Sequence, residues 1–181
     1  MQATKSTVAP MCDGHETDEI KRICFVCTGN TCRSPMAAAV ANAMAQEELS
    51  LLPASVRDLA MPGFQAFSAG LYAHDGDPIA HQAILALEEA NVQPANGLDY
   101  HTHTAHNLTE KDAAGFDLLI GLTREHAMGL MIRFPHLAQR ITFFPVDISD
   151  PYGGSLRVYR DCLTEIRSGI ASLLFSENCH E

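Results

Sequence analysis

The sequence predicts an α/β fold of three layers, α/β/α, in which helices cover both faces of a four-stranded and mostly parallel sheet. Short apolar runs alternate along the chain with segments whose apolar residues recur every three or four positions, a pattern typical of strands alternating with amphipathic helices. The first apolar run, at residues 23–26, leads into a loop containing Gly, Asn and Thr and then into an alanine-rich helical segment. Loops between a strand and a helix N-terminus often bind phosphate, so we place a phosphate-binding loop after the first strand.

The first half of the chain is predicted to contain two strand–helix units. The predicted elements are, in order, a strand at 23–26, a helix from 34 to 49, a connection over 51–63, a strand at 64–68 and a helix at 79–91. A stripe of apolar residues at three- and four-residue spacing supports the first helix and is expected to face the core: Met36, Ala37, Val40, Ala41 and Met44. Pro53 and Pro62 favour an irregular connection.

The second half is predicted to repeat the alternation. The elements are a strand at 116–122, a helix at 123–134, a strand at 141–146 and a helix from 156 to 173. Thr123 is expected to cap the third helix, and Ser155 the last one, because short polar side chains accept hydrogen bonds from the first turn. The last helix has the most regular apolar spacing: Leu156, Tyr159, Leu163, Ile166, Ile170 and Leu173.

The length of the chain, 181 residues, and the lack of an internal repeat predict one domain, which we place at residues 21–176. Residues 1–20 are expected to form a flexible N-terminal tail, because they mix charge, proline and polar residues without the apolar core of a signal peptide. Residues 177–181 are expected to form a C-terminal tail.

Composition restricts the partners and the compartment. The net charge of −10 argues against a general nucleic-acid or membrane surface, and no run approaches the ~20 apolar residues of a membrane span. The spacing of the six cysteines fits a reducing compartment better than a disulfide framework. We therefore expect a cytoplasmic protein, monomeric, without nucleic-acid or membrane partners.

The loop after the first strand reads Cys-Thr-Gly-Asn-Thr-Cys-Arg-Ser-Pro over residues 27–35. Its backbone N–H groups and the following helix N-terminus favour oxyanion binding. Cys27 is the expected nucleophile, because a helix N-terminus and a nearby arginine favour the thiolate. Arg33 is expected to bind two phosphoryl oxygens with its planar fork. A tight turn is expected through Gly29, with Ser34 donating to the sulfur and Asn30 bracing the turn.

A carboxylic acid is also needed, because the group that leaves phosphorus requires a proton. Asp150 is the best candidate: it lies beyond a predicted strand, and Asp150-Pro151 precedes the loop Tyr152-Gly153-Gly154. Asp147 is the alternative acid.

Three motifs together resemble the low-molecular-weight protein tyrosine phosphatase family: CTGNTCRSP at 27–35, SAG at 68–70 and DPYGGS at 150–155. The resemblance covers about residues 21–175 and implies that the domain is a low-molecular-weight phosphatase domain. It implies a phosphocysteine on Cys27, phosphate binding by Arg33 and proton transfer by Asp150, without metal or cofactor. The implied substrate is a phosphorylated protein, and the remaining binding residues are Thr28, Gly29, Asn30, Thr31, Cys32, Ser34 and Tyr152.

One position separates branches of this family. Members that act on phosphotyrosine usually carry an aliphatic residue four places after the nucleophile, where this chain has Thr31. The branch that removes phosphate from arginine resembles this sequence there, and a threonine hydroxyl can hydrogen-bond to a guanidino group. The segment at 150–155 keeps one aromatic residue, Tyr152, where many tyrosine-directed members have two, although the arginine branch more often has phenylalanine there. We therefore expect a protein-arginine phosphatase, with a protein tyrosine phosphatase as the alternative.

Two less favoured functions are an arsenate reductase and a non-catalytic phosphate-binding module. The reductase needs further cysteines for its disulfide relay, and none lies between Cys32 and Cys162. The presence of Arg33 and Asp150 argues against both functions.

Cys32 and a group of histidines leave further questions open. Cys32 could form a reversible disulfide with Cys27, or it could be packed in the core; the sequence favours neither. His101, His103 and His106 could be mistaken for a metal site, but they lack cysteine or carboxylate partners at the usual spacing and are expected to be polar loop residues.

Overall fold

A computed structural model describes residues 21–51 and 63–175 of the chain. Its strands form one sheet in the order β2-β1-β3-β4, and all three strand pairings are parallel. The strands are β1 (Lys21–Cys27), β2 (Phe64–Gly70), β3 (Leu118–Gly121) and β4 (Ile141–Phe143). This arrangement confirms the predicted sheet. The expected tails at 1–20 and 177–181 lie outside the described residues, as does most of the predicted connection.

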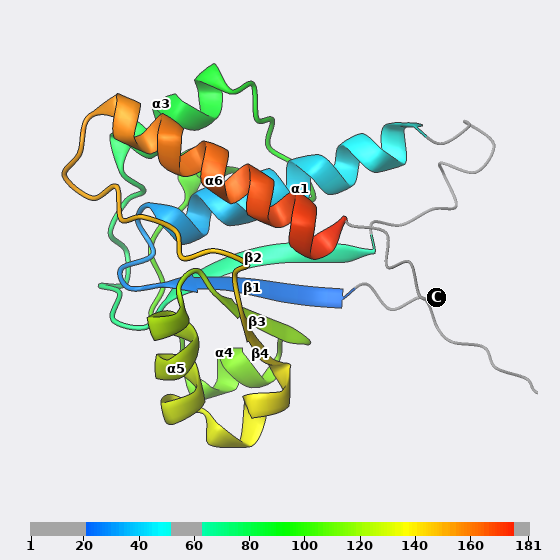
Figure 1. Ribbon diagram of the computed structural model, residues 1–181, viewed down its shortest axis with the longest axis vertical. Coiled ribbons are helices and arrows are strands. Elements are labelled where there is room, and N and C mark those ends of the chain that lie inside the picture. The colour runs from blue at the N-terminus through cyan, green and yellow to red at the C-terminus, as the bar shows by residue number, and fades with distance from the viewer. Residues whose placement is uncertain (1–20, 52–62, 176–181) are drawn as a thin grey trace, which may run out of the picture.

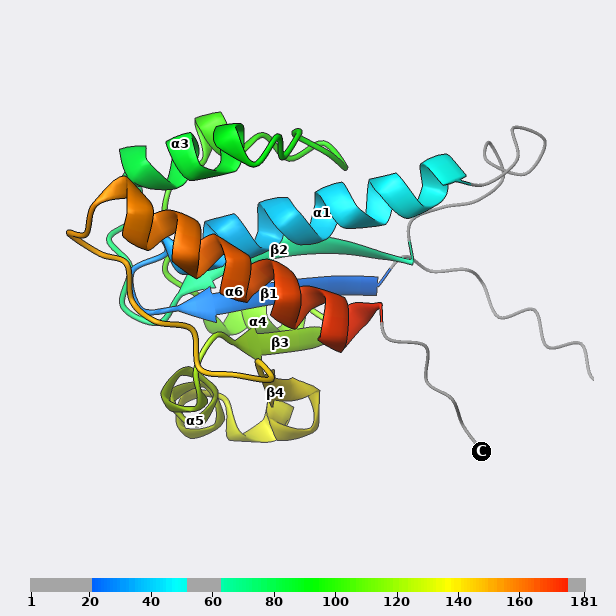
Figure 2. The ribbon, with the colours of Figure 1, turned by 45° about the horizontal axis from the view of Figure 1, so that its top comes forward.

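Helices cover both faces of the sheet, which confirms the three layers (Figure 2). One face carries α1 (Arg33–Leu51), α3 (His81–Glu89) and α6 (Leu156–Leu174), and the other carries α4 (Glu110–Ala114) and α5 (Arg124–Arg133). Short 3₁₀ helices span Tyr100–Thr102 and Pro135–Arg140. No helix within the described ranges is long and apolar enough to cross a bilayer.

The central strand β1 contributes side chains to two hydrophobic cores. Ile23 and Phe25 pack in the core beneath α1, α3 and α6, whereas Cys24 and Val26 pack in the core beneath α5. All four are buried, as expected for a strand whose alternating side chains face helices on both sides. This double burial explains why β1 is apolar without interruption from Ile23 to Cys27.

The two long helices bury the apolar stripes that the sequence predicts. In α1, Met36 and Val40 are buried, and in α6 Tyr159, Ile166 and Ile170 are buried. Ser155, which was expected to cap the last helix, is the N-cap residue of α6, but its side chain makes no capping hydrogen bond. The expected position is therefore correct, and the expected bond is not formed.

The differences from the sequence prediction concern short elements. β4 ends at Phe143 rather than Val146. The Phe144 N–H still donates to the Gly121 carbonyl, but the next bond is that of the Ile148 N–H to the Leu122 carbonyl, so the chain leaves the strand register between these two residues, where Pro145 lies. Helix α4 was not predicted. Its five residues are too few to produce a helical period, and a capping box between Thr109 and Asp112 closes its first turn.

Candidate active site

The loop between β1 and α1 lies at the carboxyl edge of the sheet (Figure 1). β1 ends at Cys27 and α1 begins at Arg33. The segment after β2 holds the start of the loop, because the Leu71 N–H donates to the Cys27 carbonyl and the Tyr72 N–H donates to the Thr28 carbonyl, each at 2.9 Å. The first turn of the loop is thus fixed by the neighbouring strand's continuation.

Gly70, the last residue of the SAG motif, lies opposite Cys27 in the strand register. A Cβ atom at this position would lie 2.7 Å from the Thr28 carbonyl oxygen and 3.2 Å from the Asn30 Cβ. Because any side chain would push the loop away, glycine is required where β2 passes beneath it.

Two polar groups of the loop contact the sulfur of Cys27. Ser34 Oγ lies 3.0 Å from Cys27 Sγ, and the Asn30 N–H donates to the sulfur at 3.3 Å. Hydrogen bonds to a charged acceptor are stronger than those to a neutral one, so these two groups can stabilise negative charge that develops on the sulfur. The Ser34 contact is the one expected from the sequence.

The residue with left-handed backbone in the loop is Asn30, whose φ is 56°, and not Gly29. Asparagine adopts this region more readily than most residues, and its side chain is held firmly here. Its Oδ1 accepts from the His106 N–H at 2.8 Å, and its Nδ2 donates to Ser34 Oγ at 2.9 Å and to Ser68 Oγ at 3.0 Å. Asn30 therefore braces the turn through its amide.

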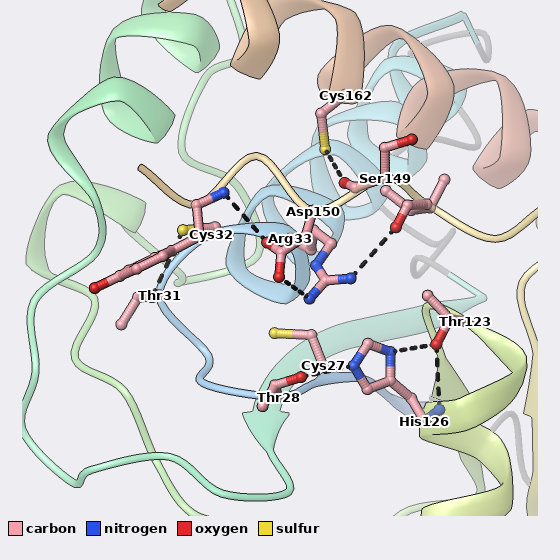
Figure 3. A network of polar contacts seen from close by, with 12 residues as sticks. Cys27, Thr28, Thr31, Cys32, Arg33, Thr123, His126, Ser149, Asp150 and Cys162 are labelled. Atoms are coloured by element: carbon pink, nitrogen blue, oxygen red, sulfur yellow. Dashed lines mark hydrogen bonds and ion pairs between the residues drawn. The ribbon is translucent and has the colours of Figure 1, made fainter. Parts of the chain in front are cut away.

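Arg33 and Asp150 form an ion pair at the site (Figure 3). Arg33 Nη2 donates to Asp150 Oδ2 at 2.8 Å, and Nη1 donates to the Ile148 carbonyl at 3.3 Å. The Arg33 side chain is buried, whereas that of Asp150 is 55% exposed. The Tyr152 N–H also donates to Asp150 Oδ1 at 3.2 Å. The carboxylate is thus held beside the guanidinium while one side of it stays open to solvent.

The alternative acid, Asp147, has a different position. Its Oδ1 accepts from the Arg124 N–H at 2.8 Å, at the first residue of α5, and it does not line the pocket that contains Cys27. Of the two carboxyl groups considered, only that of Asp150 lines this pocket.

A pocket of about 500 Å³ brings the sequence-predicted residues together. Its wall includes all of them except Ser34, which lies behind the loop: Cys27, Thr28, Gly29, Asn30, Thr31, Cys32, Arg33, Asp150 and Tyr152. The pocket also has lining residues that the sequence did not predict: Tyr72, His74, Asp77, Pro78 and Ala80. Their position directly after the second strand was the available signal, since loops beyond parallel strands meet at one edge.

His126 was also missed, and it lies beneath the loop (Figure 3). Its Nε2 is 3.0 Å from Thr28 Oγ1 and its Nδ1 is 3.0 Å from Thr123 Oγ1. Thr123 is the N-cap of α5, as predicted, and accepts from the His126 N–H. Burial and, secondarily, the charge of Arg33 lower the pKa of His126 to about 4. The imidazole is therefore neutral near pH 7.

This neutral histidine predicts a pH dependence of stability. The pKa of His126 falls from 6.5 to about 4 on folding, so the unfolded chain takes up the proton first as the pH falls. Protonation of His126 therefore does not affect the free energy of unfolding above about pH 6.5, but it lowers that free energy by about 2–3 kcal/mol by pH 4. Urea denaturation of wild type and His126→Gln between about pH 7 and pH 4 should give a steeper decline for wild type; equal slopes would contradict a buried neutral imidazole.

The cysteines of the described residues are all free. Cys32 is buried, with its Sγ 3.2 Å from the Tyr159 hydroxyl, and burial raises its pKa. Burial also raises the pKa of Cys24, which packs on the other face of the sheet. The position of Cys32 agrees with core packing; the other alternative, a reversible disulfide with Cys27, stays untested.

The three neighbouring histidines do not form a metal site: among the residues described, no group of three ligand side chains could hold an ion. His101 is bonded to Asp99 at 2.7 Å. His103 Nε2 donates to the Asn30 carbonyl at 2.9 Å, and burial lowers the pKa of His103. His103 and the backbone of His106 thus both hold Asn30 in the loop between β1 and α1. The sequence did not predict this role, because the two histidines lie more than 70 positions from Asn30.

Comparisons with known proteins agree with this geometry. The family model described as low molecular weight phosphotyrosine protein phosphatase matches residues 22–180. A protein-arginine-phosphatase of Geobacillus stearothermophilus is 31% identical over 84% of this chain and 93% of its own length. The structure of a low molecular weight protein tyrosine phosphatase from T. tengcongensis is 32% identical, with a TM-score of 0.68 over 86% of this chain and 98% of that one.

A further solved structure is of the YwlE arginine phosphatase, as a cysteine-to-serine mutant with a phosphorylated active-site serine. It is 26% identical, with a TM-score of 0.70 over 87% of this chain and 97% of that one. On this fold, a loop that carries both a cysteine and an arginine, with a carboxylate paired to that arginine, defines a cysteine-dependent phosphatase. The chain belongs to the low-molecular-weight phosphotyrosine protein phosphatase family.

Proposed function

We propose that this protein hydrolyses phosphoarginine on protein substrates through a phosphocysteine intermediate on Cys27. The observation that carries the proposal is that Cys27, Asp150 and the threonine Thr31 line one pocket. A guanidino group offers several N–H donors, and an oxygen of the Asp150 carboxyl group and the Thr31 hydroxyl supply acceptors for them. Two relatives named protein-arginine-phosphatase, 31% and 30% identical, support the same assignment.

In the first step the Cys27 sulfur attacks phosphorus, forming an S–P bond as the N–P bond to arginine breaks. Arg33 and the loop N–H groups bind the equatorial oxygens, where negative charge is concentrated. Asp150 enters this step as the carboxylic acid, gives its proton to the departing nitrogen and becomes a carboxylate. The carboxyl group is partly exposed and is held by one ion pair and by the Tyr152 N–H, so a turn of the side chain can bring it from Arg33 toward the leaving group.

In the second step water attacks the phosphocysteine. Asp150, now ionised, takes a proton from the water, the S–P bond breaks, and Cys27 leaves as a thiolate. The Ser34 hydroxyl and the Asn30 N–H stabilise the departing sulfur. The relative with a phosphorylated active-site serine supports a covalent intermediate at the equivalent position.

Substrate choice is proposed to depend on Thr31. Replacing it with isoleucine removes a hydroxyl and adds an apolar surface suited to a phenyl ring, so Thr31→Ile should shift preference from phosphoarginine toward phosphotyrosine by roughly tenfold or more. The measurement is the ratio of kcat/KM values for peptides carrying each phosphorylated residue.

Two further variants separate the hydroxyl from the shape of the side chain. Thr31→Ser keeps the hydroxyl and should retain the preference of wild type, whereas Thr31→Val keeps the shape and should lose part of it. If Thr31→Ile leaves the ratio unchanged, the residue does not determine the substrate.

The alternative is a protein tyrosine phosphatase. Two exposed aromatic side chains, Tyr72 and Tyr152, are 75% and 80% accessible and line the pocket, where they could stack on a phenyl ring. Relatives named protein-tyrosine-phosphatase match at 24–32% identity, among them one from Staphylococcus haemolyticus at 29%. Hydrolysis of phosphoarginine and phosphotyrosine peptides by the purified chain at matched concentration decides between the two.

We also propose that residues 21–176 form a monomeric, cytoplasmic phosphatase domain that acts on phosphorylated proteins without a metal or cofactor. The unpaired cysteines of the described residues suit a reducing compartment. Sedimentation equilibrium should give the mass of one chain, 19.7 kDa, and activity should persist in excess chelator.

A further inference from the structure

A partly buried hydrogen-bonded bridge joins the start of α5 to the loop between β1 and α1. Thr28 directly follows the nucleophile, and its Oγ1 lies 3.0 Å from Nε2 of His126, 98 positions further along the chain (Figure 3). We propose that His126 is a positioning residue of the phosphatase reaction, which holds Thr28 and the first turn of the loop in the geometry that receives the phosphoryl group. The inference rests on the phosphatase activity, not on the choice between arginine and tyrosine.

Both ends of this bridge are fixed. On the helix side, His126 Nδ1 lies 3.0 Å from Thr123 Oγ1, and the same oxygen accepts from the His126 N–H at 3.2 Å. A Cβ at Gly121 would clash with the backbone of Ala127, so α5 begins in tight contact with β3. The ring is therefore attached to the rigid junction between a strand and a helix.

On the loop side, Thr28 is held twice. Its carbonyl accepts from the Tyr72 N–H at 2.9 Å, and its hydroxyl is bonded to His126. Because Thr28 adjoins Cys27, its orientation sets the direction of the first loop amide relative to the nucleophilic sulfur. Displacements of about 1 Å in such groups can reduce rates by about 10²-fold.

The imidazole in this bridge is neutral near pH 7, because burial lowers its pKa. One ring nitrogen then donates and the other accepts, so the ring can join two hydroxyl groups in series. The side chain is 7% exposed, and burying a polar ring is unfavourable unless it is hydrogen-bonded. An apolar side chain would fill the same space, but it would leave the Thr28 hydroxyl without this partner. Packing alone does not account for histidine at this position.

Two variants of His126 with uncharged amide side chains, glutamine and asparagine, form a matched pair that tests the proposal. Glutamine at position 126 places its terminal amide near the site of Nε2 and can still reach Thr28, whereas asparagine places its amide near Nδ1 and can reach only Thr123. We expect His126→Gln to keep kcat/KM for p-nitrophenyl phosphate within about threefold of wild type. His126→Asn should lose about 10- to 100-fold and bind vanadate, a mimic of the transferring group, correspondingly less tightly.

The melting temperatures of the two variants show whether stability is responsible. A purely structural histidine would lower activity in proportion to the loss of folded protein and leave the vanadate affinity of the folded fraction unchanged. Wild-type vanadate affinity in a folded His126→Asn variant, or equal loss of kcat/KM in the two variants, would overturn the proposal.

Thr28 provides an independent test if the His126 variants fold poorly. Thr28→Val preserves the shape but removes the hydroxyl, and should lose kcat/KM by about the same factor as His126→Asn, whereas Thr28→Ser should keep most of it. If the two residues act through one bond, the double variant Thr28→Val/His126→Asn loses no more than either single variant. Losses that multiply in the double variant would contradict the bridge.

Discussion

The Cys27→Ser variant is expected to lose turnover by at least about 10⁴-fold. A serine hydroxyl at this position retains its proton near neutral pH and is a much weaker nucleophile than a thiolate. Nothing else in the described pocket replaces it, because the other sulfur in its wall, that of Cys32, is buried against Tyr159. Steady-state hydrolysis of a phosphorylated peptide measures the effect.

Phosphate binding by the variant shows whether only the nucleophile is lost or the whole binding site. Cys27→Ser leaves Arg33 and the loop amides in place, so inorganic phosphate should still bind. Cys24→Ala is the matched control: this thiol is fully buried on the opposite face of the sheet, and its removal should cost about 1 kcal/mol of stability or more while leaving kcat unchanged. A Cys27→Ser protein with full activity would place the nucleophile elsewhere.

The sequence predicted the parts of the fold that repeat with a regular period. Helix α6 buries Tyr159, Ile166 and Ile170 at the expected spacing, and β1 was visible as an apolar run. The period carries this information because one face of each helix, or both faces of the strand, must leave water. It carries none for α4, which makes only one turn, or for the early end of β4.

The chemical groups of the site were predictable because they adjoin one another along the chain or follow a strand. Cys27 and Arg33 belong to one loop, and Asp150 lies beyond β4. The groups that hold the loop come from distant segments: His103 contacts Asn30 across 73 positions and His126 contacts Thr28 across 98. No local pattern reports such contacts, since they depend on strand order and on how closely α5 approaches the sheet.

The Asp150→Ala variant is expected to lose about 10²- to 10⁴-fold in kcat, the range associated with loss of a general acid. The loss should be largest for substrates whose leaving group needs a proton, such as phosphoarginine, and much smaller for p-nitrophenyl phosphate, whose leaving group departs readily as an anion. Comparison of kcat for the two substrates in wild type and variant measures this difference.

Asp150 also pairs with Arg33, so its removal has two consequences that must be separated. Asp150→Asn keeps an acceptor for Arg33 Nη2 but has no proton of suitable acidity to transfer. If proton transfer is the main contribution, Asp150→Asn loses nearly as much activity as Asp150→Ala. If orientation of Arg33 is the main contribution, Asp150→Asn recovers most of the rate on both substrates. Asp147→Asn, which preserves the acceptor for the Arg124 N–H, should retain activity, and a large loss there would transfer the acid role to Asp147.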